Sequence, residues 1–175
     1  MSTTEAQRKI ANMLAALKAE APAIALRMGQ TGLTAMKEDS IRDGITVDGS
    51  FANYTTNQVY KSSMKKKARN AAGGAYASSG GKGNWGEFRA AQGLKSDHVN
   101  LFYTGQMWSA LRIIAQSQNG YRYSVLVGAS NGDAGRLLIA NIERYGNFLK
   151  LSDEKKRLII ADAAADVTDI VKRYL

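Results

Sequence analysis

The stretch Leu111–Ala129, LRIIAQSQNGYRYSVLVGA, decides the fold of this chain. The residues that alternate onto one face of its second half are Tyr121, Tyr123, Val125 and Val127. Alternation with a period of two is typical of a half-buried strand. Between the two apolar runs, Asn119 and Gly120 favour the positive φ angles of a tight turn. The stretch therefore predicts a β-hairpin, with strands over 111–116 and 121–129.

A helical pattern precedes the hairpin, over residues 4–29. Its apolar residues, spaced alternately by four and three, are Ile10, Leu14, Leu17, Ala21, Ile24 and Met28. This spacing predicts a seam that packs against another helix, from the same chain or from a neighbouring one. Pro22 predicts a kink or a split in the helix. The glycines over 29–32 predict its end, followed by a second short helix over 33–42.

Further elements flank the hairpin on its C-terminal side. The sequence predicts a helix over 133–145 that stops at Gly146, and a last helix over 153–174 with Ser152 as its N-cap. VNLFY (99–103) predicts a short strand before the hairpin. Together these patterns predict an α+β fold with N-terminal helices, a small and mostly antiparallel sheet, and a C-terminal helix packed on that sheet, all within one domain over 1–175.

Positive charge is concentrated in one-fifth of the chain. The 175 residues carry a net charge of +9, and residues 61–95 hold eight lysines and arginines against Glu87 alone, which accounts for +7. The same segment contains the tract AAGGAYASSGGKGNWG (71–86), whose small residues bury little apolar surface. We therefore expect 61–95 to be a long mobile loop that is disordered in the isolated subunit and orders on assembly.

The basic segment supplies the candidate contact residues for phosphates or for an acidic protein surface. They are Lys61, Lys65, Lys66, Lys67, Arg69, Lys82 and Arg89. Binding of phosphates by such residues is independent of base sequence and weakens with salt. The aromatic residues interleaved with them offer stacking on unpaired bases. A loop whose lysines only keep the protein soluble is the alternative interpretation.

Catalytic and metal-binding patterns are weak in this sequence. GKGNWG (81–86) matches G-x-G-x-x-G, but the preceding residues ASSG do not predict the strand that a dinucleotide fingerprint requires. His98 is the single histidine, and the chain has no cysteine, so zinc sites of the usual ligand sets are excluded. We expect no enzyme activity, no cofactor and no metal. No stretch approaches the ~18 apolar residues of a membrane span, so no membrane partner is expected.

Several segments resemble the head–tail joining, or tail-completion, proteins of tailed bacteriophages. They are VNLFYTGQMWSALRI (99–113), SVLVGA (124–129) at the end of the hairpin, and IERYGNFLKLSDEKKRLI (142–159). Upstream, GSFANYTTNQVYKSSMKKK (49–67) is similar to the family segment that precedes a variable basic loop. The family-motif positions expected to serve packing or assembly are Tyr54, Thr104, Gly105, Met107, Trp108, Gly146, Phe148 and Leu149.

The resemblance implies a structural virion protein of the phage neck or the head-proximal end of the tail. Such a protein joins head to tail, or completes the tail, as a ring around the DNA channel, and a hexamer is expected. Its partners are then copies of itself, other neck, connector or tail-tube proteins, and the phage DNA in the lumen. The implied location is the virion, assembled in the host cytoplasm. The alternative is a nonspecific nucleic-acid-binding protein that acts through the basic loop.

Overall fold

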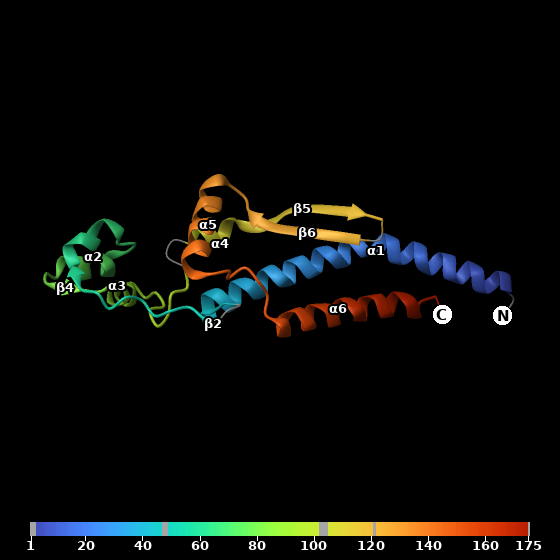
Figure 1. Cartoon of the computed structure of the whole chain (residues 1–175), viewed down its shortest axis with the longest axis horizontal. Helices are drawn as coiled ribbons and strands as arrows, with labels where there is room; N and C mark the ends of the chain where they lie inside the picture. The colour runs from blue at the N-terminus through green and yellow to red at the C-terminus, as the bar shows by residue number, and fades with distance from the viewer. Residues whose placement is uncertain (1–2, 47–48, 102–104, 121, 175) are drawn as a thin grey trace.

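A helix of 36 residues, α1 (Thr3–Glu38), forms the spine of the computed structural model (Figure 1). The structure describes residues 3–46, 49–101, 105–120 and 122–174. After α1 come η1 (Asp39–Asp43), β1 (Ile45–Thr46), β2 (Gly49–Ser50), β3 (Val59–Tyr60), η2 (Lys61–Lys67), α2 (Ala71–Ser78), β4 (Lys82–Gly83), α3 (Trp85–Ala91), α4 (Gln106–Ala110), β5 (Leu111–Asn119), β6 (Arg122–Ala129), α5 (Gly132–Tyr145) and α6 (Asp153–Lys172). The predicted mixed fold, with helices at both ends of the chain and an antiparallel hairpin, is confirmed.

The first helix is one continuous element, where the sequence predicted two. Pro22 lies inside α1 on an exposed side, and the helix continues through it. Gly29 and Gly32 are also helical: a Cβ at Gly29 would lie 2.7 Å from Val125 Cγ1, and a Cβ at Gly32 would lie 3.3 Å from Leu151 Cδ1. The predicted break at 29–32 is therefore wrong. Other elements cross close to α1 here, so glycine provides space rather than a turn.

The predicted hairpin is present as β5 and β6, which pair antiparallel with a bulge between Ile113 and Ala115. Its turn differs in one detail from the prediction. Asn119 pairs with Arg122 and is the last residue of β5. Of the two residues predicted to adopt positive φ, Gly120 does so, with φ 61°, and Asn119 does not. The predicted strand over 99–103 is not formed in its described part, because Leu101 takes φ 55° and Val99 and Asn100 lie in irregular backbone.

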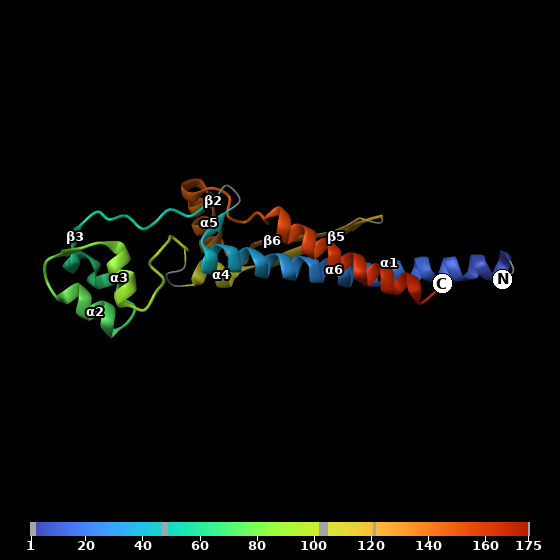
Figure 2. The same cartoon turned by 90° about the horizontal axis from the view of Figure 1, so that it is seen from below.

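Two elements flank α1: β6 packs along one side of it, and α6 runs antiparallel to it along another (Figures 1 and 2). The caps of the last two helices are those predicted. Gly146, with φ 81°, ends α5, and the Ser152 hydroxyl accepts a hydrogen bond from the Lys155 amide at the start of α6. We expected α6 on the sheet, but α6 packs mainly on α1, which lies between α6 and the hairpin.

The main core lies at the C-terminal end of α1, where α4, α5 and the base of the hairpin meet (Figure 1). Its buried members are Phe51, Val99, Met107, Trp108, Leu111, Leu138 and Phe148. The ring of Phe148 lies 5.9 Å from that of Phe51 and 5.6 Å from that of Trp108, between centroids. Aromatic side chains from three distant segments therefore hold this part of the molecule together.

Residues 59–95 form a separate small lobe beyond the end of α1, which we call the basic lobe (Figures 1 and 2). The remaining described residues form the body. The sequence predicted an unstructured loop over 61–95, and the structure corrects this prediction: η2, α2, β4 and α3 lie within it. Met64, Ala77 and Phe88 are buried in the centre of the lobe. Three residues at wide spacing thus make a core that the Gly-, Ser- and Ala-rich composition did not indicate.

Candidate nucleic-acid interface: the basic lobe

The geometry of η2 sorts the lysines of the basic lobe into two groups. A 3₁₀ helix repeats every three residues, so Lys61, Met64 and Lys67 share one side of η2. Met64 enters the lobe core, while Lys61 Nζ lies 4.4 Å from the ring centroid of Tyr76 and Lys67 Nζ lies 5.5 Å from that of Trp85. These two ammonium groups are held at the rims of the core by cation–π contacts.

The other lysines of η2 point away from the core. Lys65 and Lys66 lie on the remaining two sides of the helix and are exposed, as is Arg69 just beyond it. Exposed basic side chains of this kind are typical of surfaces that bind the phosphates of nucleic acids without reading base sequence.

A further lysine is placed beside an exposed ring by the short ladder of β3 and β4. Tyr60 and Lys82 are directly opposite in this antiparallel pair, and Lys82 Nζ lies 5.3 Å from the Tyr60 ring centroid. The Tyr60 side chain is 66 % exposed. An exposed ring next to cations is able to stack on an unpaired base while the cations neutralise its phosphate. Sequence reasoning missed Tyr60, although its position beside Lys61 was a signal.

The single carboxylate of the basic lobe is tied to the lobe itself. Glu87 Oε2 accepts a hydrogen bond of 2.6 Å from the Tyr76 hydroxyl, and its Oε1 accepts one of 2.8 Å from Asn84 Nδ2. The bond to Tyr76 lowers the pKa of Glu87. Burial and the same hydrogen bond raise the pKa of Tyr76 to about 12. A Cβ at Gly83 would collide with this hydroxyl, so glycine is required there for packing.

Of the glycines over 81–86, Gly83 therefore serves packing inside the lobe, and Gly81, with φ 71°, serves the turn before β4. β4 pairs antiparallel with β3, whereas the fingerprint needs a parallel strand leading into a long helix. α3, which follows, has seven residues and is capped by the Asn84 side chain, which accepts from the Glu87 amide.

Arg89 differs from the other candidate contact residues, because it is buried at 2 % exposure. Its Nε donates to the Lys95 carbonyl oxygen at 2.9 Å, and its Nη2 donates to Asn100 Oδ1 at 3.0 Å. The guanidinium also lies 4.8 Å from the ring centroid of Tyr54. The structure removes Arg89 from the contact surface: it orders the attachment of the lobe.

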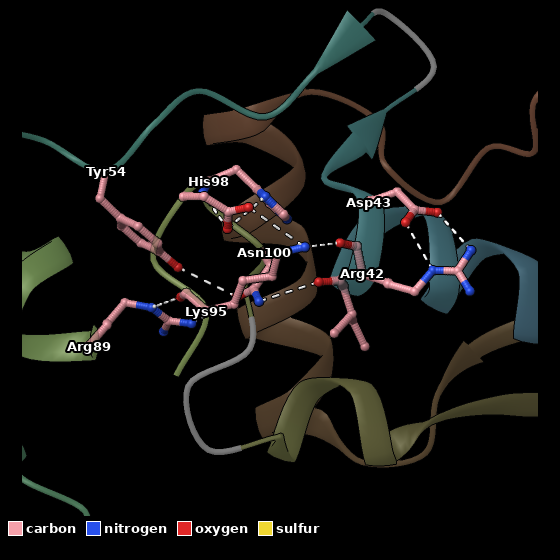
Figure 3. A network of polar contacts seen from close by, with 9 residues as sticks. Arg42, Asp43, Tyr54, Arg89, Lys95, His98 and Asn100 are labelled. Carbon is pink, nitrogen blue, oxygen red and sulfur yellow. Dashed lines mark hydrogen bonds and ion pairs between the residues drawn. The ribbon is translucent and has the colours of Figure 1, made fainter. Parts of the chain in front are cut away.

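This attachment continues into the body through a group that we call the polar junction: Arg89, Lys95, Asn100 and the backbone of 41–42 (Figure 3). Asn100 Nδ2 donates to the Ile41 carbonyl oxygen at 3.4 Å, and the Lys95 ammonium donates to that of Arg42. The polar junction thus links α3 of the lobe to the end of η1. Asn100 was not singled out from the sequence, since an asparagine in an apolar stretch has no distinctive pattern.

The family-motif positions fall mostly in the body. Met107, Trp108 and Phe148 are buried together in the main core, and Leu149 and Tyr54 pack against it. Gly105 takes φ 75° and is the N-cap of α4, a backbone conformation that favours glycine. Thr104 lies outside the described residues. Phe148 anchors the loop between α5 and α6 in the main core, in agreement with the packing role expected for it.

The described part of the chain has neither a metal-binding cluster nor a membrane-spanning helix. No group of three histidine, cysteine, aspartate or glutamate residues is placed to hold a metal ion there. His98 Nδ1 lies 3.1 Å from the Asp97 carboxylate. Within the same residues, none of the helices combines the length and the apolar character needed to cross a membrane. A comparison with protein families, curated proteins and solved structures gives no match to this chain.

Proposed function

We propose that this protein is a structural subunit of the neck of a tailed bacteriophage, where it joins head to tail or completes the tail as a ring around the DNA. It acts by shape and assembly, without catalysis. Its partners in this role are copies of itself, adjacent neck, connector or tail-tube proteins, and the DNA in the channel. The sequence resemblance over 49–67 and 99–159 is the origin of the proposal.

The observation that carries it is the exposed apolar surface of the body. The exposed large apolar residues of α1, α5, α6 and the hairpin are Ile10, Leu14, Ile114, Leu126, Leu137, Ile139, Leu158, Ile160 and Val167. Among the described residues, neither outer edge of β5 and β6 is paired with a third strand. Contact with other subunits would cover these apolar side chains and the open edges of the hairpin.

Two measurements test the neck role. Native mass spectrometry of the purified chain and of disassembled particles should give a single ring of defined subunit number. Electron microscopy of particles made without the protein should show unjoined heads and tails, or tails of abnormal length. A monomer in both settings, or normal particles without the protein, would contradict the proposal.

The second candidate function is nonspecific nucleic-acid binding through the basic lobe. The exposed lysines of η2 and the Tyr60–Lys82 pair favour it. Changing Lys65, Lys66, Lys67 and Arg69 to serine should reduce DNA affinity by about a hundredfold at low salt. The slope of log K against log salt should flatten by about 3.6, at about 0.9 for each of the four lost phosphate contacts.

A matched control removes the same charge from the body. The exposed residues Arg112, Arg122, Lys150 and Arg157 are changed to serine for this purpose. Equal losses of affinity in the two variants would mean that net charge alone, and not the basic lobe, attracts DNA. The neighbouring genes also distinguish the two functions. Genes for portal, capsid and tail-tube proteins would favour the neck role, whereas genes for replication or repair would favour nucleic-acid binding.

A further inference from the structure

An open apolar groove follows α1 between β6 and α6, and we call it the trough. Its floor is the α1 seam, including Leu17, Ala21 and Met28, and its walls include Tyr123 of β6 and Ile160 and Val167 of α6. Alanine and glycine in the floor leave space above α1, so another backbone is able to approach it closely.

Polar contacts join both walls of the trough to α1. On the α6 side, Arg27 pairs with Asp166, and Arg173 lies 3.2 Å from Glu20. On the hairpin side, the Tyr123 hydroxyl donates to the Lys18 carbonyl oxygen at 3.3 Å.

The N-terminal part of α1 extends past the end of α6 (Figures 1 and 2). We call residues 3–14 the projecting segment. Ile10 and Leu14 are 51 % and 55 % exposed. In a heptad frame set by the seam, Ile10 and Leu14 occupy d and a, whereas Glu5, Arg8 and Lys9 fall at f, b and c on the far side. The projecting segment therefore presents an uncharged face, which is apolar at Ile10 and Leu14 and carries Gln7 at the preceding a position.

We propose that the trough of one subunit receives the projecting segment of a second copy. The two surfaces are successive stretches of one seam, so a helix that continues the heptad pattern meets a floor with the same pattern. Their lengths agree: at 1.5 Å per residue, 3–14 and the floor from 14 to 28 each span roughly 20 Å. This inference rests on the proposed function, whose assembly contacts it identifies.

Charge argues for the same occupant. The basic lobe carries +7 of the net +9, which leaves +2 for the rest of the chain. An acidic partner would be drawn to the basic lobe, whereas the trough and the projecting segment are both apolar surfaces in a body that is close to neutral. Of the other helices, α5 exposes Leu137 and Ile139, which are two residues apart and do not form one helical face.

The absence of cysteine from the chain makes a direct test possible. Ile10→Cys and Val167→Cys single variants are mixed, oxidised and analysed for the mixed disulfide by mass spectrometry. Docking predicts that this cross-link forms readily. Ile10→Cys mixed with Ser62→Cys, at an exposed position of the basic lobe, supplies the background. A cross-link no stronger than that background would overturn the proposal.

A charge placed on the seam gives an independent readout. Leu14→Asp should weaken self-association at least about tenfold, since it puts a carboxylate into an apolar contact. Ala15→Asp adds the same charge to the same helix on an exposed position off the seam and should have little effect. Circular dichroism checks that both variants fold. Equal association of the two variants would overturn the docking.

The outcomes separate this inference from the neck role. A ring that forms without the Ile10–Val167 cross-link would overturn trough docking and leave the ring in place. A cross-linked species that closes as a two-fold dimer, in solution and in particles, would support trough docking and contradict the ring. Heterologous contacts that continue from subunit to subunit are what a ring requires.

Discussion

The body and the basic lobe are stabilised by cores that are assembled in different ways. The body is organised along a 36-residue helix and gathers its core from segments far apart in the sequence, such as Phe51, Trp108 and Phe148. The basic lobe uses 37 consecutive residues and centres on three buried side chains. The body leaves apolar surface exposed and is nearly neutral, while the lobe exposes lysines. This difference is the basis of the two roles proposed above, assembly through the body and polyanion binding through the basic lobe.

The largest expected effect separates the two cores. Phe88 and Phe148 are 0 % and 2 % exposed, and changing either to alanine should cost about 3–5 kcal/mol. Because the lobe has few other buried residues, Phe88→Ala should unfold the lobe and leave the body folded, whereas Phe148→Ala should unfold the body. Hydrogen exchange resolved along the chain distinguishes these results. Global unfolding by Phe88→Ala would show that the lobe and the body form one cooperative unit.

A smaller effect is expected at the polar junction that joins the two parts. Arg89→Met removes the donors to the Lys95 carbonyl oxygen and to Asn100 Oδ1, which keeps the weaker hydrogen bond of 3.5 Å from the Tyr54 hydroxyl, and should cost about 2–3 kcal/mol. The rate of amide hydrogen exchange should rise over residues 94–100. Arg89→Lys should rescue little, because an ammonium does not reproduce the fork of the guanidinium.

Lys82→Met is the matched control for this change, because it removes the same charge from an exposed position. It should change the free energy of unfolding by less than about 0.5 kcal/mol. If Arg89→Met were equally silent, Arg89 would have no role in attaching the lobe.

Local signals explain what the sequence predicted correctly. The hairpin alternation, the stop at Gly146 and the N-cap at Ser152 each depend on residues within a few positions of each other. Such patterns act through the backbone of their own segment, so the structures that they predict depend little on contacts with the rest of the chain.

The errors lie where distant segments decide the outcome. Gly29 reads as a helix breaker, yet the approach of Val125 makes it a packing residue. The sequence predicted Arg89 to be an exposed contact residue, yet its guanidinium is buried against Asn100 and Tyr54. The trough could not be predicted from the sequence either. The α1 seam that forms its floor was evident, but the walls of the trough come from β6 and α6, about a hundred residues or more away along the chain.

One helical glycine in the lobe and one in the body should respond differently to alanine, with changes in the free energy of unfolding of about 1 kcal/mol or more. Gly74→Ala in α2 should stabilise the lobe by up to about 1 kcal/mol, because a Cβ there meets nothing within 4 Å. Gly29→Ala gains the same propensity but places its Cβ 2.7 Å from Val125 Cγ1 and forces the hairpin to shift, at a cost of about 1–3 kcal/mol. Denaturant unfolding of the two variants should give opposite signs. Stabilisation by Gly29→Ala would mean that the hairpin moves freely on α1.

The smallest effect concerns the hydrogen bond between Tyr76 and Glu87 inside the lobe. The pKa of Tyr76 is raised to about 12, above the ordinary value of 10.0, by burial and by this bond. A phenol with a raised pKa in the folded state stabilises that state fully below pH 10, and this contribution is lost as the pH rises from 10 through 12. The pKa of Glu87 is lowered, so its contribution is present at neutral pH and is lost as the pH falls below the usual range of a glutamate.

The lobe should therefore be most protected between these two limits, and Tyr76→Phe should remove the alkaline limit while costing about 1 kcal/mol or less at neutral pH. The ultraviolet absorbance of phenolate, recorded for the protein and for Tyr76→Phe, gives the titration of this one hydroxyl by difference. We expect a midpoint near 12, with circular dichroism showing that the lobe helices persist to that pH. A midpoint near 10 in a folded lobe would mean that Glu87 does not hold the hydroxyl, and that the carboxylate is then available to offset the lysines of η2.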